Sequence, residues 1–269
     1  MNPRKRLATT SRIHNRGHAF RFLRARTLLA VMTITLAPGI VGSQPETNRR
    51  GATDDLGIRW IEVEAGSIKM GGDGAARTIS IERFLISATE VTFDQYDAFC
   101  DATGTQKPDD NGWGRGARPV INVSYEDAAE FCEWLSGETR SGVRLPSEAE
   151  WVYAAQGGHR SQGYTYSGGN DKDEVSWNQD NSGDRTHPVG TKQPNELGLY
   201  DMSGNLWEWC ADVPQAETRV SGKDAEHVVC GDSFDNPGSS MGYKLSVRLP
   251  GDSRHINIGF RIARSDQRH

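Results

Sequence analysis

The sequence predicts a single α+β domain, rich in loops, over residues 57–268. Short strand-like runs stand near both ends of this region, and three capped helices lie between them. The 269-residue chain contains 30 Gly and 11 Pro with 35% hydrophobic residues, which is typical of a globular fold with much irregular structure. Separate runs of strands and helices favour the α+β class over alternating βαβ units.

Five segments carry the residue pattern of strands. Three precede the helices and two follow them, and all are bounded by Gly, Pro or polar clusters. They are residues 58–64, 67–70, 77–86, 227–230 and 256–263. Residues 157–196, mostly Gly, Ser, Asn, Asp, Thr and Pro, are expected to form a long loop of functional importance, or one held by ions or bridges.

Each of three helices begins with a capping-box pattern, in which a hydroxyl residue stands three positions before an acid or amide. The pairs are Thr92 with Gln95, Ser124 with Asp127, and Ser147 with Glu150.

The first 43 residues read as an export signal. They carry eight Arg or Lys and no acid, followed by the apolar run 27–37, which is shorter than the ~20 residues that span a bilayer. A polar linker over 44–56 follows, and the alternative is an uncleaved N-terminal anchor. We expect a periplasmic or extracellular protein with no integral membrane domain after cleavage.

The rest of the chain is acidic. It carries 23 basic and 36 acidic side chains, a net charge of −13. A nucleic-acid partner is therefore not expected, because no basic surface is available to neutralise phosphates.

Four cysteines follow the export signal: Cys100, Cys132, Cys210 and Cys230. An even number in an oxidising compartment predicts two disulfides, with three possible connectivities. Cys100 and Cys132 each fall on the apolar face of a helix, so two buried thiols are the alternative. We favour Cys100–Cys132, which leaves Cys210–Cys230.

The segment 198–209, Gly-Leu-Tyr-Asp-Met-Ser-Gly-Asn-Leu-Trp-Glu-Trp, fits neither a helix nor a strand period. Together with Val91-Thr92, the block from Arg144 to Trp151 and the block 257–263, it resembles the formylglycine-generating enzyme (sulfatase-modifying factor) family. The resemblance runs in order along nearly the whole chain after the signal. It implies a divergent C-type-lectin-like α+β fold.

The resemblance also implies a calcium ion at this segment. The matching ligands are the side chains of Asp201 and Glu208 and the backbone carbonyls of Gly204 and Leu206, oxygen donors of the kind that calcium takes. The alternative is that both acids cap turns while the tryptophans fill the core. A second calcium site of the family, near Asn178, is not matched.

The chain departs from the family at the catalytic segment. The family oxidase binds copper through two cysteines, whose positions fall here on Asn236 and Met241. An amide and a thioether do not replace a thiolate pair, so neither copper nor formylglycine generation is expected.

We therefore predict a binding or maturation module for a small molecule or an exported protein. Its ligand cleft would be walled by Ser233, Asn236, Met241, Lys244 and Arg248. One alternative is an oxidoreductase of the wider family, of the non-haem iron or siderophore-maturation type, although the histidines lack metal-ligand spacing. A hydrolase using Ser233 and His255 is a chance similarity, since the surrounding strand–helix alternation is missing.

Overall fold

The computed structural model describes residues 56–71, 77–211, 225–238 and 242–265. These all fall in a compact unit that spans residues 49–269. The predicted export signal, nearly all of the predicted linker and the cleft residue Met241 lie outside the described residues.

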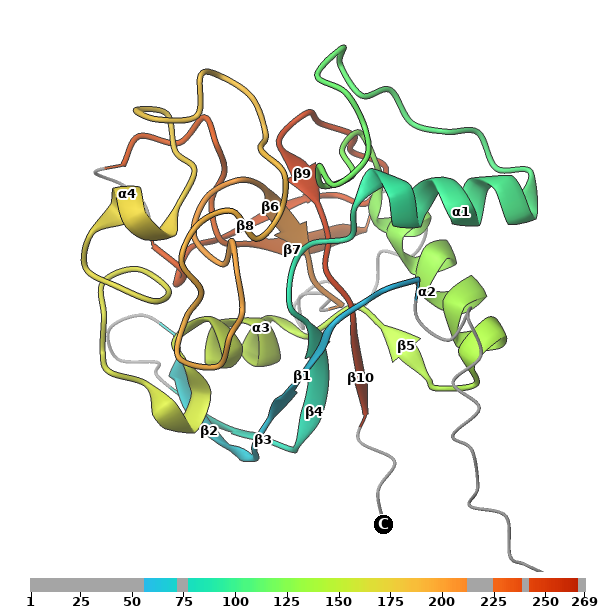
Figure 1. Ribbon diagram of the computed structural model, residues 1–269. Coiled ribbons are helices and arrows are strands. Elements are labelled where there is room, and N and C mark those ends of the chain that lie inside the picture. The colour runs from blue at the N-terminus through green and yellow to red at the C-terminus, as the bar shows by residue number, and fades with distance from the viewer. Residues whose placement is uncertain (1–55, 72–76, 212–224, 239–241, 266–269) are drawn as a thin grey trace, which may run out of the picture. The chain divides into compact units, whose positions relative to one another are not determined.

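One four-stranded sheet joins the two ends of the domain (Figure 1). Its order is β1 (Trp60–Val63), β4 (Phe84–Ser87), β10 (Ala263–Ser265) and β5 (Val143–Arg144), with antiparallel neighbours. The C-terminal strand thus pairs between segments from early and middle parts of the chain. A separate hairpin is formed by β2 (Gly66–Met70) and β3 (Arg77–Ile81).

A second four-stranded sheet carries the central segment. Its order is β8 (Ser246–Pro250), β7 (Glu226–Cys230), β6 (Trp207–Trp209) and β9 (Ile258–Gly259). The β6–β9 pair is parallel, and the other two pairs are antiparallel. Strand β8 is therefore the outermost strand on one side.

All three predicted capping boxes are confirmed. They begin α1 (Phe93–Thr103), α2 (Tyr125–Thr139) and α3 (Glu148–Ala155), and in each the cap hydroxyl and the third helical side chain bond to each other's backbone. The predicted long loop is largely irregular, with only the 3₁₀ turn Gly158–Arg160 and the short α4 (Lys172–Val175).

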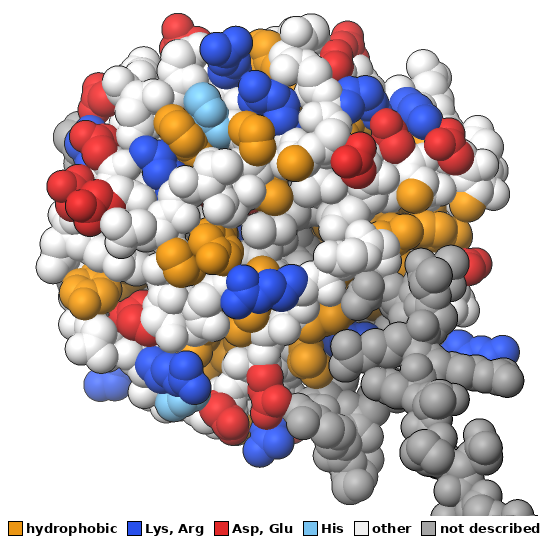
Figure 2. Space-filling view, viewed as in Figure 1, with side chains coloured by type: hydrophobic (Ala, Val, Ile, Leu, Met, Phe, Trp, Pro, Cys, Tyr) orange, Lys and Arg blue, Asp and Glu red, His pale blue; other side chains and the backbone are white. Residues whose placement is uncertain are grey.

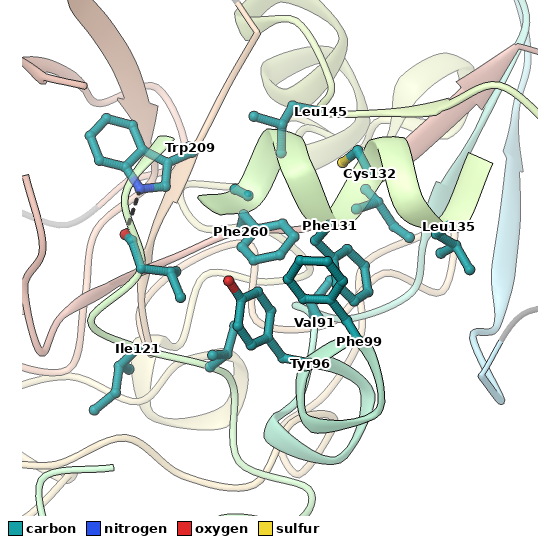
Figure 3. Packing of buried hydrophobic residues seen from close by; sticks show 14 of the residues in the cluster. Val91, Tyr96, Phe99, Ile121, Phe131, Cys132, Leu135, Leu145, Trp209 and Phe260 are labelled. Carbon is teal, nitrogen blue, oxygen red and sulfur yellow. Dashed lines mark hydrogen bonds between the residues drawn. The ribbon is translucent and has the colours of Figure 1, made fainter. Parts of the chain in front are cut away.

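Two hydrophobic clusters hold the domain. In the first, aromatic side chains of α1 and α2 pack with Phe260, and the Trp209 indole donates a hydrogen bond to the Val123 carbonyl (Figure 3). In the second, α3 packs on the hairpin and on β7 through Trp151 and its neighbours. No helix in the described residues combines the length and apolar character needed to cross a membrane.

Two predicted strands are each divided. Residues 77–86 form β3 and β4 in different sheets, because Glu82 and Arg83 turn the chain outward and Arg83 pairs with acids of the β1 segment. Residues 256–263 form β9 and the first residue of β10, with Phe260–Ile262 entering the core between them. Strands β5 and β6 have too few residues to show a period, and β8 was not among the predicted strands.

Neither predicted disulfide is drawn in this structure, in which Cys100, Cys132, Cys210 and Cys230 are buried, and the two bridges stay a prediction. In the β6–β7 ladder Cys230 lies opposite Glu208, and the Cys210 amide bonds to Val228. The two cysteines are thus diagonal neighbours across the sheet rather than directly opposite each other. The Cys100 thiol lies beside the Gln106 carbonyl, whereas Cys132 lines a groove with Val143 and Leu145.

Candidate functional site

The centre of the site is a buried ion pair between Glu208 and Arg261. The guanidinium Nε lies 2.6 Å from Glu208 Oε2 and its Nη2 lies 2.8 Å from Oε1. The Trp151 indole donates a third hydrogen bond to Oε2 at 2.7 Å. All three side chains are fully buried. Strand β6 thereby joins α3 to the segment that leads into β10.

Two more acids, Glu90 and Asp201, lie in the same buried cluster. Burial, reinforced by the neighbouring charges of Asp201 and Glu208, raises the pKa of Glu90 well above its ordinary value. Burial also raises the pKa of Asp201, to about 6. Although burial acts to lower it, the pKa of Arg261 is raised by these carboxylates, Glu208 first. One cation thus stands among three acids.

The oxygens of the predicted calcium ligands are mostly engaged in hydrogen bonds within the protein. Asp201 Oδ2 accepts from the Gly190 amide, and Oδ1 has no partner among the described residues. Both oxygens of Glu208 are engaged by Arg261 and Trp151, and the Gly204 carbonyl accepts from the Leu206 amide.

Only Asp201 therefore keeps a spare side-chain oxygen in the predicted set. The residues as arranged do not fit a calcium ion ligated by Glu208, since the ion would displace Arg261. Among the described residues, no group of three or more His, Cys, Asp or Glu side chains is placed to hold a metal. Calcium stays an untested prediction.

Asp232 links the turn at Gly204, in the central segment 198–209, to Gly242, which precedes β8. Its carboxylate accepts hydrogen bonds from the amides of Gly204 and Gly242, and the side chain is fully buried. Burial raises the pKa of Asp232 to about 6, even though both amides favour the charged form. Only backbone groups therefore balance this carboxylate among the described residues.

Asn236 is built into the turn that follows Asp232. Its side-chain carbonyl accepts from the Ser233 amide at 3.0 Å, the Ser233 hydroxyl at 2.6 Å and the Trp207 indole at 3.1 Å. Its own backbone carbonyl accepts from Gln179. The residue at the first copper position is thus a hub of hydrogen bonds that fixes a tight turn.

Beside this turn the second sheet has a shallow groove of about 250 Å³. Side chains from all four strands line one face of it, together with part of the segment before β9. The lining residues are Trp207, Val229, Val247, Leu249, His255, Asn257 and Ile258. Trp207 is shared with the Asn236 turn, and Asn257 donates to Asp235 in that turn.

The predicted cleft residues are therefore only partly together. Ser233 is buried and serves the turn with Asn236, whereas Lys244 and Arg248 lie exposed on and before β8. On the face of the molecule shown in Figure 2, charges of both signs are interspersed with small apolar areas. No broad basic field is visible on that face.

The alternative chemistries find no matching geometry in the described residues. The Ser233 hydroxyl bonds to Asp235 and Asn236, and no histidine contact is formed by it. His187 stacks on Trp177, and His227 stacks on Tyr125, so these two rings pack on different elements. Neither a Ser–His pair nor a histidine metal site is assembled there.

Sequence reasoning missed Glu90, Trp151 and Arg261 as members of the central network. A signal for Arg261 was present, because a charged residue stands within the apolar run Ile258–Ala263. Buried charges are rare unless paired, so this arginine predicts an acidic partner. The identity of that partner could not be read from the sequence.

Fold and site together define a mixed helix–strand domain with short strands, capped helices and a buried ion pair at its centre. The sequence profile of the sulfatase-modifying factor enzyme 1-like domain matches residues 46–266. The chain belongs to this family, as its motifs indicated.

Individual relatives are of more than one kind. The chaperone protein LppX of Paenibacillus barcinonensis is 31% identical over 253 residues, covering 73% of this chain and 86% of that protein. The formylglycine-generating enzyme of Streptomyces coelicolor is 32% identical over 184 residues, covering 56% of this chain but only 54% of the enzyme. Nearly equal identity to both means that similarity alone does not assign an activity.

Among solved structures, the crystal structure of CarF is similar with a TM-score of 0.66 and 28% identity. The match covers 79% of this chain and 100% of that chain. The predicted α+β, sulfatase-modifying-factor fold is confirmed.

Proposed function

We propose that this chain is an exported module that binds a protein partner and assists its maturation, without copper-dependent cysteine oxidation. The observation that carries the proposal is the role of Asn236. Where the family oxidase is expected to have a copper thiolate, an amide oxygen accepts three hydrogen bonds from Ser233 and Trp207. Copper(I) selects soft sulfur ligands, which this position does not supply.

The relatives support the binding half of the proposal. LppX, which matches over most of both chains, is named as a chaperone protein. A chaperone must recognise polypeptide rather than one small substrate. The groove beside the Asn236 turn has the apolar lining suited to a polypeptide side chain.

The geometry gives the proposal a contact residue. The Trp207 indole is held in place by Asn236 and lines the groove, so the turn positions one wall of the surface. Aromatic side chains in partly enclosed pockets supply much of the binding energy in protein interfaces. Trp207 is therefore the residue whose truncation should matter most.

The binding test uses the mature protein and a permanently unfolded chain, reduced and carboxymethylated α-lactalbumin. We expect saturable binding that Trp207→Ala weakens by about tenfold, the size of one good aromatic contact. The matched control is Trp177→Ala, which removes an indole stacked on His187 outside the groove. Equal binding by wild type and Trp207→Ala would remove the groove from the proposal.

A second assay tests the missing oxidase chemistry. The protein is incubated with copper(I), oxygen and a peptide containing one cysteine, and the peptide is analysed by mass spectrometry. We expect the cysteine to stay unconverted, as in a sample without the protein. Formation of formylglycine would overturn the proposal and support the hypothesis that the protein is a formylglycine-generating oxidase.

A further inference from the structure

Strand β8 has two chemically different faces. Its odd-numbered residues, Leu245 just before the strand and Val247 and Leu249 within it, form an apolar stripe. The even-numbered Ser246 and Arg248 are polar or cationic and lie on the opposite face, and Lys244 lies exposed in the turn just before the strand. Such strict alternation is the pattern of a sheet strand with one apolar side.

The outer edge of β8 is open in the described part of the chain. The order of the sheet places β8 at one end, where it pairs only with β7. The Gly231 amide donates to the Leu245 carbonyl, and the Gly251 amide donates to the Ala225 carbonyl. These bonds fix the odd-numbered residues of β8 as those that bond to β7.

In an antiparallel ladder the intervening residues direct their N–H and C=O groups to the other side. The backbone groups of Ser246 and Arg248 therefore point away from β7, and no partner for them occurs in the described residues. In the same register, the backbone of Pro250 is also directed away from β7. A proline is tolerated where no amide is needed for the ladder, as at a sheet edge.

The apolar stripe is also exposed. The large hydrophobic side chains that are exposed in the described residues are Leu245 at 39%, Val247 at 45% and Ile256 at 39%. Two of them belong to the stripe on β8, next to the groove lined by Val247 and Leu249. An exposed apolar strand at a sheet edge is a template for pairing with another strand, and proteins usually protect it.

Charge selects the kind of strand that can pair there. Arg248 on the polar face of β8, with Lys244 in the turn just before the strand, makes this edge cationic, although the chain after residue 43 carries a net charge of −13. A strand added to this edge lays alternate side chains beside Leu245 and Val247 and the others beside Lys244 and Arg248. A second copy of β8 would bring like charges together, so self-pairing is disfavoured.

We propose that β8 binds an extended segment of a partner polypeptide in which apolar and acidic residues alternate. The segment adds to the sheet as a fifth strand, through backbone hydrogen bonds to Ser246 and Arg248. Its apolar side chains cover the β8 stripe, and its acidic side chains lie beside Lys244 and Arg248. This inference rests on the proposed function and names the class of polypeptide that the module recognises.

The test uses the mature protein and a short synthetic peptide of alternating glutamate and valine. We expect saturable binding, with the largest NMR shifts at the amides of Ser246 and Arg248. Arg248→Pro removes the outward amide and leaves the bonds of Val247 and Leu249 to β7 in place. It should weaken binding by about tenfold or more, since a lost backbone bond adds to the lost charge contact.

The matched control is Arg248→Gln, which keeps the amide and removes only the charge. It should weaken binding by no more than about fivefold, and most of that loss should vanish at high salt. A peptide of alternating lysine and valine should bind more weakly than the glutamate peptide. Circular dichroism of each variant confirms that the sheet remains folded.

Several results would overturn the inference. One is that wild type and Arg248→Pro bind the glutamate peptide equally well. Another is that the lysine peptide binds as tightly as the glutamate peptide. A third is that the protein itself forms a dimer that dissociates only in the Arg248→Pro variant. If unfolded α-lactalbumin binds but the glutamate peptide does not, the proposed function is supported and the β8 site is contradicted. If the glutamate peptide binds but α-lactalbumin does not, the β8 site is supported and the general maturation role is contradicted.

Discussion

Arg261 and Glu208 form a two-point ion pair in which both side chains have no solvent exposure. The arginine comes from the segment before the last strand, and the glutamate comes from the central strand β6. Because Arg261 also donates to the carbonyls of Ser87 and Tyr200, it links the two sheets of the domain. The pair acts as a structural centre rather than as an exposed binding group.

Arg261→Met should therefore destabilise the fold strongly. It leaves Glu208 buried beside Glu90 and Asp201 without its cation, and breaking a buried pair in this way costs about 3–5 kcal/mol. Urea denaturation followed by tryptophan fluorescence measures the loss. Glu208→Gln combined with Arg261→Met should cost less than the sum of the two single changes.

The exposed pair between Arg83 and Glu62 provides the control, with side-chain exposures of 48% and 35%. Arg83→Met should change the free energy of unfolding by no more than about 1 kcal/mol. Similar costs at Arg83 and Arg261 would contradict a structural role for the buried pair.

Stability should rise as the pH falls from 7.5 to 5. The pKa of Asp232 is raised from its ordinary 3.8 to about 6 in the folded state, chiefly by burial. The folded protein therefore takes up a proton near pH 6, whereas the unfolded chain does so near pH 4. This stabilisation is fully present below the unfolded pKa and is lost as the pH rises through 6.

The gain from Asp232 is at most about 3 kcal/mol, and the raised pKa values of Asp201 and Glu90 act in the same direction. Burial lowers the pKa of His187 and of His227, and these two groups act in the opposite direction as the pH falls. The lower limit of the window is set by Glu150. Although burial opposes it, the paired Arg144 lowers the pKa of Glu150, so its contribution is lost only in stronger acid. Urea titrations at pH 7.5, 6 and 5 measure the effect, and Asp232→Asn should flatten it. The same pH dependence in wild type and Asp232→Asn would refute the assignment.

The helices and the fold class could be predicted from the sequence, because their causes are local. A capping box such as Ser147 with Glu150 places its own hydrogen-bond partners three residues apart. The strands were harder, because β5 and β9 have two residues each and exist only through their neighbours in the sheet. The calcium set raised the same difficulty: the family resemblance implied Glu208 as a ligand, while a distant arginine, Arg261, donates hydrogen bonds to both of its oxygens.

All four cysteines should be thiols that are inaccessible to alkylating reagents in the native protein. Burial raises the pKa of the Cys132 thiol and also that of the Cys100 thiol. Low thiolate content and burial both slow alkylation. Native protein at pH 8 should thus react slowly with iodoacetamide, while unreduced protein in guanidinium should take up one label at each of the four cysteines. Fewer labels without reductant would restore the predicted bridges.

Calcium should leave the melting temperature unchanged relative to excess chelator. A calcium ion takes six to eight oxygen ligands, and it stabilises a fold only by binding the folded state. Of the side-chain oxygens in the predicted set, only Asp201 Oδ1 has no hydrogen bond among the described residues, and Arg261 holds the carboxylate of Glu208.

The decisive comparison is between Asp201→Ala and Asp252→Ala, which removes an exposed acid elsewhere. A calcium-dependent rise in melting temperature that Asp201→Ala abolishes and Asp252→Ala preserves would establish the sequence-based site. Glu208 would then have to release Arg261 when the ion binds, and the ion pair would be a feature of the calcium-free state alone. With no rise in any of the three proteins, the buried pair takes the structural place that the sequence pattern assigned to the metal.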